Sequence, residues 1–536
     1  MWTPVISLSV ILTVLNQLPF FYGVLNKSSD MVYLGTVHYY EDYFFYINHF
    51  FQGAHGAWLT VNRYTSEPTN PSIIYWFNIL LGKIGGAISL SPILTYNIAV
   101  ILLSVIALTL TFYLISTILP DSTMALSAFI YATFSTSVLN SVTLGNGQRG
   151  WWPVELWKTP HFLFDRLSSV PHQIMQTILF SLAMLFIFTK PSHHHMNRVY
   201  TIGSVISVGL LATINPMIAI ILVALLWPAH IATIMTNRSR IASGQWIKLI
   251  SVTTVAIILF LFMNHELSQP AHSFSKYWDS MQQTQSTLPF LILSIGPIVP
   301  FAVIGVISKF KTLDALGWFG LLLIVGCYSI FLSPIPKYLG VANVRILFPG
   351  MYVFWGVYAA HGSLAIARFV GKYLPVKPQR MIIVCLVVFM VIVSPTAVWE
   401  TARKISSKDQ TMSPLVYLPR DMYDGFVSLS TLLPYDDIVI ANHTTHMDLF
   451  VPALSGHTSY SGHPLTTIQA DRKNQEIMKI FSLVQNPEDT KTWLGQNHIR
   501  YIFVTSLDGS IEQFQTYYPF LRVIRKTSGA AILEVP

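Results

Sequence analysis

Two adjacent carboxylates, Glu41 and Asp42, follow shortly after the first long apolar run of the chain. A carboxylate in this place could act as a general base that draws the proton from an acceptor hydroxyl as it attacks a sugar carbon. It could equally ligate a divalent metal ion that neutralises a leaving phosphate. Because neighbouring side chains point to different sides of a helix or strand, we expect one acid in the site and one supporting it. The alternative is that both only cap the aromatic helix expected to follow, Tyr43–Phe51.

Basic and other ionisable residues further along the chain are candidates for holding a phosphate. Arginine grips phosphate and pyrophosphate in bidentate fashion, and lysine adds a point charge. For any single residue, the alternative is contact with lipid headgroups. The candidate substrate-binding residues are Arg149, Lys158, Asp165, Arg166, His172 and Arg345.

Long apolar runs must position these residues. Hydrophobic residues make up 52% of the chain and charged residues only 10%, whereas a soluble protein carries about 25% charged residues. A membrane span needs roughly 20 mostly apolar residues. We find eleven such runs, at residues 3–24, 93–119, 123–142, 171–189, 199–214, 216–236, 247–265, 287–308, 313–334, 346–367 and 381–399. Only the tripeptide Ile214-Asn215-Pro216 joins the fifth and sixth runs, so an alternative is that these two runs form one re-entrant element.

The distribution of basic residues predicts the direction of the spans. The short loops after spans four, six, eight and ten hold eleven Lys or Arg residues and almost no acid. The positive-inside rule places these loops in the cytoplasm. An odd number of spans then makes the N-terminus cytoplasmic and everything after residue 400 extracytoplasmic. We therefore expect a multi-pass protein of the plasma (inner) membrane.

The regions on the opposite side are longer and richer in chemistry. Two outer loops, residues 25–92 and 140–170, are aromatic and mixed in charge, and residues 73–83 read as an interfacial helix. Residues 1–400 are expected to form the membrane domain and residues 401–536, with the charge density of a soluble protein, a small α/β domain with a partly parallel sheet. The expected helices of that domain are 420–433, 471–484 and 487–496, and the expected strands are 438–442, 500–505, 521–525 and 530–535.

Several functions are disfavoured by the same patterns. The net charge of +8 resides in short topological loops, so nucleic acid is not an expected partner. Cys327 and Cys385 lie inside apolar runs, which suits neither a disulfide scaffold nor a zinc site. No Gly-rich phosphate-binding pattern follows a strand. The loops of residues 441–464 could meet an acceptor or cover the membrane site, but we favour an ordinary loop in which backbone groups satisfy the histidines. The residues concerned are His443, His446, Asp448, His457 and His463.

With this topology, three stretches resemble the GT-C fold glycosyltransferases, which include the protein O-mannosyltransferases and the aminoarabinose transferases. Residues 41–67, with Glu41-Asp42-Tyr43 and Asn62-Arg63-Tyr64-Thr65-Ser66-Glu67, look like their first-loop pattern, and residues 164–172 look like the segment before their fourth span. The stretch 454–464 is similar to the Gly-x-x-x-Tyr-x-Gly-His run in the outer domain of some members.

The resemblance implies a polytopic α-helical membrane protein, a GT-C-like bundle of about 11 spans, followed by a small α/β extracytoplasmic domain. It implies a transferase that moves a sugar from a polyprenyl-phosphate donor to an outer-face glycan, lipid or protein. Asp42 or Glu41 would be its base or metal ligand, and a divalent metal ion is the one cofactor considered. Two alternatives remain. A polytopic transporter or lipid flippase would need charged groups within its spans. A non-catalytic GT-C-like assembly subunit would work through its outer domain.

Overall fold

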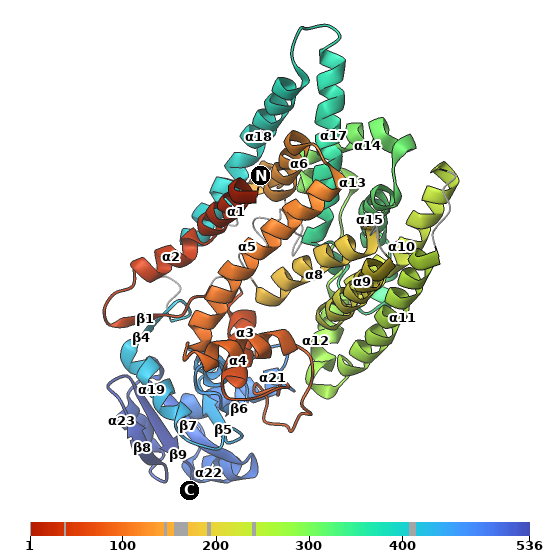
Figure 1. Cartoon of the computed structure of the whole chain (residues 1–536). Helices are drawn as coiled ribbons and strands as arrows, with labels where there is room; N and C mark the ends of the chain where they lie inside the picture. The colour runs from red at the N-terminus through yellow and green to blue at the C-terminus, as the bar shows by residue number, and fades with distance from the viewer. Residues whose placement is uncertain are drawn as a thin grey trace. The chain divides into compact units, whose positions relative to one another are not determined.

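The computed structural model describes residues 2–36, 39–143, 147–154, 170–189, 194–237, 243–406 and 414–536 (Figure 1). The chain forms two compact units. One comprises residues 1–17, 100–265 and 279–403, and the other comprises residues 18–99, 266–278 and 404–536. The second unit therefore contains both the predicted first outer loop and the C-terminal residues. The predicted division at residue 400 stays a prediction, and helix α18 (Pro378–Ser406) runs through that position.

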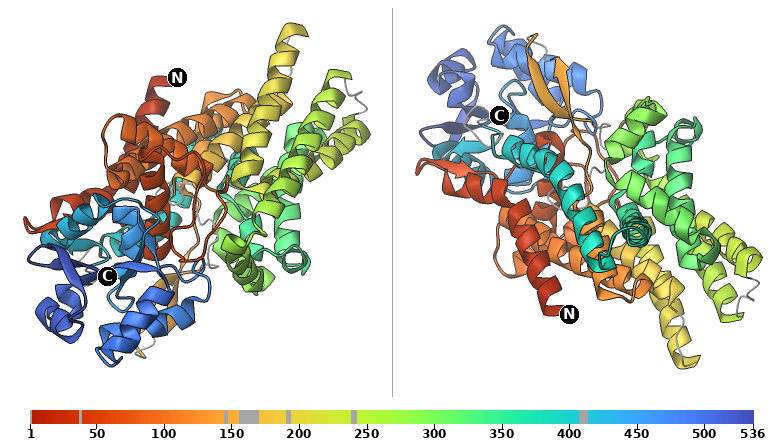
Figure 2. Two further views of the ribbon diagram at one scale, coloured as in Figure 1. Left: turned by 90° about the horizontal axis from the view of Figure 1, so that it is seen from below. Right: turned by 90° about the horizontal axis from the view of Figure 1, so that it is seen from above.

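The first unit is helical apart from one antiparallel hairpin. Helices α8, α9 and α10 pack as successive neighbours, which Figures 1 and 2 show as the yellow to light-green segments. Its elements are α1 Trp2–Asn16, α5 Pro92–Ile118, which begins in the second unit, α6 Ser122–Phe134, β2 Leu139–Thr143, β3 Arg149–Pro153, α8 Pro171–Phe188, α9 His194–Ile214, α10 Pro216–Asn237, α11 Ser243–Glu266, α13 Leu288–Ile295, α14 Ile298–Lys309, η1 Phe310–Thr312, α15 Ala315–Phe331, α16 Ile335–Tyr338, η2 Asn343–Ile346, η3 Pro349–Met351, α17 Tyr352–Val370 and α18.

Small residues allow the central helix of this unit, α17, to approach its neighbours closely. A Cβ atom at Gly305 of α14 would collide with the backbone carbonyl of Tyr358, and one at Gly362 would collide with that of Phe301. Gly356 meets the backbone of α6 at Ala128 in the same way. Lipid supplies no hydrophobic drive between helices, so close backbone contact through small residues is the usual means of association.

All eleven predicted apolar runs contain helix, but the count of eleven spans is not confirmed. Within the described residues, seven helices are long and apolar enough to cross a membrane, or up to nine if each of two bent pairs forms one span. One bent pair is α13 with α14, which break at Gly296 with φ 89°. Helices α6 and α15 are shorter apolar helices. The membrane character that the sequence predicts therefore holds, while the number of crossings stays open.

The prediction for the third apolar run is correct only in part. The run was expected to be apolar helix from 123 to 142, but α6 ends at Phe134 and residues 139–143 form strand β2. The chain leaves the helix at Ser135, which is extended, and continues through Thr136 and Ser137. Serine and threonine compete with the helical backbone for hydrogen bonds, which explains the early end.

The second unit combines helices of the 18–99 segment with a C-terminal sheet domain. The five-stranded sheet has the order β6-β5-β7-β9-β8; β6, β5 and β7 are parallel, and β9 is antiparallel to both β7 and β8. Its elements are α2 Leu18–Leu25, β1 Met31–Tyr33, α3 Tyr40–Ala54, α4 Trp76–Ala87, α12 Pro270–Met281, which ends in the first unit, β4 Tyr417–Pro419, α19 Arg420–Ser430, β5 Ile438–Ala441, α20 Met447–Phe450, η5 Val451–Ser455, β6 Thr458–Ser459, α21 Ala470–Phe481, α22 Pro487–Gln496, β7 Ile499–Thr505, η6 Ser506–Asp508, α23 Ile511–Tyr517, β8 Arg522–Lys526 and β9 Ala530–Glu534.

The partly parallel α/β domain is confirmed. Helix α22 has the predicted bounds, and the predicted strands and remaining helices agree with the observed ones to within a few residues. The sequence prediction missed several short elements, among them β6, which has only two residues, and α23, a short helix that follows β7. Both are too short to show a clear periodicity. Ile502, Leu533 and Phe514 are among the buried residues of its core.

Helices α3 and α4 of the first-loop segment pack with their backbones nearly touching. A Cβ atom at Gly53 of α3 would collide with the carbonyl of Ile79, and one at Gly82 of α4 would collide with the carbonyl of Phe50. The region expected as a helix from 73 is helical only from Trp76, because Tyr75 adopts a left-handed conformation with φ 64°. This tight pair fixes the helix that carries the two acids.

Candidate functional site

Glu41 and Asp42 lie in the first turn of α3. The N-cap residue is Tyr39, which makes no side-chain cap hydrogen bond, and the alternative in which both acids only stabilise the start of this helix stays a prediction. Negative charge in a first helical turn is favoured by the helix dipole. From Tyr43 to Gly53 every residue of α3 is buried, so only the start of the helix presents its acids at an accessible surface.

A segment of the C-terminal domain, residues 456–468, binds the first-loop segment through the backbone. Ser459 N donates to the carbonyl of Arg63 at 2.8 Å, and the Asn62 amide donates to the carbonyl of Thr466 at 2.8 Å. Gly456, with φ 78°, leaves room for the Phe51 ring. These contacts join residues that lie roughly 400 positions apart in the sequence, and all of these residues belong to the second compact unit.

His463 of this segment faces Asp42. Its Nε2 lies 3.7 Å from Asp42 Oδ1, which is a charge contact and too long for a hydrogen bond. The His463 side chain is 3% exposed and that of Asp42 is 34% exposed. The imidazole packs against the rings of Phe45 and Tyr64, at centroid distances of 5.1 and 5.9 Å.

Glu41 has a different environment. The Tyr40 ring packs edge-on against His446 at 5.2 Å between centroids. Burial, and then the hydrogen bond with Glu41, raise the pKa of Tyr40 to about 12, so its phenol stays protonated at neutral pH. Burial and the nearby His443 lower the pKa of His446, against the attraction of Glu41. His446 has φ 60°, a conformation that is uncommon outside glycine and often marks a functional constraint.

His443, whose side chain is 35% exposed, pairs with the buried Asp448. Its Nδ1 lies 2.7 Å from Asp448 Oδ2, and its Nε2 lies 3.1 Å from the Asn474 amide nitrogen. The interpretation that backbone groups satisfy the histidines of residues 441–464 is therefore wrong for His443, whose partners are side chains. The reason is that Asp448 is completely buried and needs a partner of its own.

The described residues do not fit a divalent metal ion. Within the described ranges, no group of three His, Cys, Asp or Glu side chains is placed so that it could hold one. The two histidines near these acids each face one carboxylate: His463 faces Asp42, and His446 lies near Glu41. Asp165 lies outside these ranges, and the metal-ligand alternative for Asp42 stays a prediction.

The other predicted site residues belong to the helical unit or lie outside the described ranges. Lys158, Asp165 and Arg166 lie outside, as does most of the 164–172 stretch. Arg149 is exposed in β3, and His172 lies in the first turn of α8. The substrate-binding role of all of them stays a prediction.

Arg345, in η2, already has an acidic partner. Its Nε donates to both oxygens of Asp279, at 2.7 and 2.8 Å, and the Arg345 side chain is 48% exposed. Ala342 N also donates to Asp279 at 3.0 Å, so the carboxylate is held in place. A phosphate at Arg345 would have to share the guanidinium with this acid.

Sequence reasoning considered His446 and His463 for contact with an acceptor but favoured an ordinary loop, and it missed Lys473 and the approach of the C-terminal domain to the two acids. His463 and His446 face them, and Lys473 binds Glu67 of the first-loop segment. The sequence signal for His463 is the Gly-His end of the 454–464 stretch.

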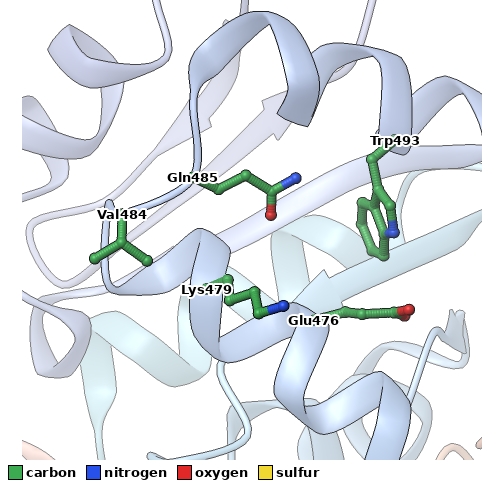
Figure 3. Close-up of a pocket in the computed structure, with 5 residues that line it drawn as sticks. All are labelled: Glu476, Lys479, Val484, Gln485 and Trp493. Carbon is green, nitrogen blue, oxygen red and sulfur yellow. The ribbon is translucent and has the colours of Figure 1, made fainter.

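A surface pocket of about 440 Å³ lies elsewhere on the C-terminal domain (Figure 3). Glu476 and Lys479 of α21, Val484 and Gln485 of the following loop, and Trp493 of α22 line it. In Figure 3 the Gln485 amide projects toward the Trp493 indole. None of the predicted site residues is in this lining, so the pocket gives no support to the predicted site.

The sequence matches no model of a known protein family and no curated protein. Its fold, however, resembles solved structures. The oligosaccharyltransferase of Archaeoglobus fulgidus in the apo form has a TM-score of 0.54 at 11% identity, over 94% of this chain and 69% of that one. ArnT from Cupriavidus metallidurans bound to undecaprenyl phosphate has a TM-score of 0.50 at 12% identity, over 98% of both chains. The mycobacterial arabinofuranosyltransferase AftD has a TM-score of 0.52 at 13% identity, over all of this chain and 40% of its own length.

These structures establish the fold. The chain has the GT-C fold of membrane glycosyltransferases, with apolar membrane helices and a C-terminal sheet domain, as the sequence resemblance implied. It is a membrane protein. At identities of 11–13% the likeness establishes the fold, and the activity is a separate question.

Proposed function

We propose that this protein is a membrane glycosyltransferase that moves a sugar from a polyprenyl-phosphate donor to an acceptor on the outer face of the membrane. The GT-C fold supports the reaction class. Two of the similar structures were determined with a lipid phosphate, ArnT with undecaprenyl phosphate and the Archaeoglobus oligosaccharyltransferase with a dolichol-phosphate and an inhibitory peptide. The acceptor glycan, lipid or protein is not specified by this likeness.

The observation that carries the proposal is the pair of acids at the accessible start of α3. Asp42 takes the proton of the acceptor hydroxyl while the acceptor oxygen bonds to the anomeric carbon of the sugar. The bond from that carbon to the phosphate oxygen breaks, and the polyprenyl phosphate leaves with the bonding electrons. Glu41 supports this step from the neighbouring position, beside Tyr40 and His446.

The donor phosphate needs positive charge. Arg149, Lys158, Arg166 and Arg345 remain our candidates for this role, because arginine and lysine stabilise a leaving phosphate electrostatically. His172 and Asp165 remain candidate substrate-binding residues. We further propose the topology that the basic loops predict, with a cytoplasmic N-terminus and an extracytoplasmic C-terminal domain in the plasma (inner) membrane.

The test compares two Glu-Asp pairs in this chain. Glu488 and Asp489 occupy the first turn of α22 as Glu41 and Asp42 occupy that of α3. D42N and E41Q are assayed beside D489N and E488Q for sugar transfer from a panel of undecaprenyl-phosphate sugars. We expect D42N to lower kcat by about 100-fold or more, within the range of a lost general base, and the α22 variants to act like wild type. Full activity in both D42N and E41Q would refute the assignment.

A further inference from the structure

His463 is buried against α3 with its Nε2 directed to the accessible carboxylate. The segment that carries it is held firmly. Gly462 N and His463 N both donate to Thr467 Oγ1, at 3.2 and 3.1 Å, and the Thr467 hydroxyl in turn donates to the carbonyl of Tyr64. The backbone that carries the imidazole is therefore held by Thr467 and, through its hydroxyl, by the first-loop segment.

The hydrogen bonds of His463 define its tautomer. Leu465 N donates to His463 Nδ1 at 3.1 Å, so Nδ1 is an acceptor and carries no proton. The neutral ring then bears its hydrogen on Nε2, the atom that faces Asp42. With Nδ1 occupied and Nε2 protonated, His463 has no free lone pair with which to act as a base, and it can only donate toward the acid.

Nε2 of His463 makes no hydrogen bond among the described residues, although it is buried. A buried donor without a partner is unfavourable. The Asp42 oxygen at 3.7 Å is within a small side-chain movement of hydrogen-bond distance. Catalytic hydrogen bonds are often long in the free enzyme and tighten when substrate binds.

We propose that His463 is a positioning residue, which holds the Asp42 carboxylate in its ionised form and in the orientation that accepts the proton of the acceptor. This inference rests on the proposed transferase function and deepens it, because it selects Asp42 over Glu41 as the working acid. A donor hydrogen bond to a carboxylate stabilises the charged form. His463 itself neither gains nor loses a proton in the step.

The test replaces His463 with glutamine or with asparagine, because the side-chain amide nitrogen of each takes the position of one of the two ring nitrogens. The H463Q side-chain nitrogen reaches the position of Nε2 and keeps a donor toward Asp42, whereas H463N reaches only the position of Nδ1. In the full-length protein in lipid nanodiscs, we expect H463N to lower kcat for transfer from undecaprenyl-phosphate sugars by about 10- to 100-fold with little change in KM. H463Q should stay within a few-fold of wild type. The acidic limb of the pH profile should move upward in H463N only.

His457 provides the matched control. It is buried in the same segment and packs edge-on against the rings of Tyr435 and Tyr501. H457Q and H457N should leave kcat and the pH profile unchanged. Equal losses in H463Q and H463N, with matching falls in thermal stability, would overturn the proposal in favour of a packing role, and so would full activity in H463N.

A spectroscopic readout keeps this inference separate from the transferase proposal. In ¹⁵N-histidine spectra of the full-length protein, the signals lost in H463Q belong to His463. They should show a protonated Nε2 and an unprotonated Nδ1, and D42N should shift the Nε2 signal. Failure of wild type to transfer any sugar would contradict the proposed function alone. A protonated Nδ1, or an Nε2 signal that D42N leaves unmoved, would overturn the positioning role.

Discussion

The ammonium group of Lys473, in α21 of the C-terminal domain, donates to the Glu67 carboxylate of the first-loop segment at 2.6 Å. Ser66 Oγ accepts from the same ammonium at 2.8 Å, and the Tyr460 ring lies 4.8 Å from it. The Lys473 side chain is 1% exposed and that of Glu67 is 35% exposed. The two segments are therefore joined by a cation that has almost no access to water.

This asymmetry predicts unequal effects of removing either partner. E67Q leaves a buried ammonium without its counter-charge and should lower the free energy of unfolding by roughly 3 kcal/mol, whereas K473M leaves an acid that water can reach and should do less damage. The double variant should recover part of the loss in E67Q. Thermal unfolding in detergent checks the order, and a larger loss in K473M than in E67Q would contradict it.

The His443–Asp448 pair predicts how stability depends on pH. Burial raises the pKa of Asp448 to about 6, and the hydrogen bond with Asp448 raises the pKa of His443. Both groups thus hold protons in the folded state at pH values where the unfolded chain releases them. Their contribution is fully present below about pH 4 and is lost as the pH rises through 6 and above.

The variant that isolates this contribution is D448N, which keeps an acceptor for His443 without the charge. Wild type should lose up to about 3 kcal/mol relative to D448N between pH 4 and pH 8, the equivalent of two pKa units. Thermal unfolding of both proteins across this range provides the measurement. A stability difference that is flat with pH would show that the pair does not titrate in this way.

Because α3 and α4 approach so closely, we expect that one methyl group added between them lowers the stability of the protein strongly. G82A places a Cβ against the Phe50 carbonyl, which forces α4 away from the helix that carries Glu41 and Asp42. We expect a loss of about 1–3 kcal/mol, as for other overpacked sites. Gly495, in α22, has nothing within 4 Å of its Cβ position, so G495A should be neutral or slightly stabilising. Equal melting temperatures for G82A and wild type would argue against the tight packing.

Arg345 is the described phosphate-binding candidate whose surroundings allow a sharp prediction. R345A should weaken binding of undecaprenyl phosphate about 10-fold, the effect of one charge-assisted hydrogen bond. D279N frees the guanidinium from its acid and should leave affinity unchanged or increase it.

The matched control for Arg345 is Arg403, which pairs with Glu400 at 3.0 Å and is 49% exposed. Native mass spectrometry of the lipid-bound protein gives the affinities of R345A, D279N and R403A for undecaprenyl phosphate. Equal losses in R345A and R403A would indicate a nonspecific effect of charge.

Local patterns in the sequence predicted much of the secondary structure. Each apolar run long enough to span a bilayer contains helix, since the hydrocarbon requires backbone groups to bond within their own segment. The strands of the C-terminal domain were visible because β-branched and aromatic residues suit a half-buried sheet. Pro487 at the start of α22 and Asn486 as its cap marked that helix directly.

Tertiary structure alone decided the partners of the two acids. Their position near a first span was plain in the sequence, but His463 lies 421 positions after Asp42, and Lys473 lies 406 positions after Glu67. No periodicity relates residues so far apart, because local spacing encodes only neighbours on one helix or strand. The packing of residues 456–468 against the first-loop segment creates the imidazole–carboxylate arrangement, so this part of the candidate site arises from folding and not from any motif.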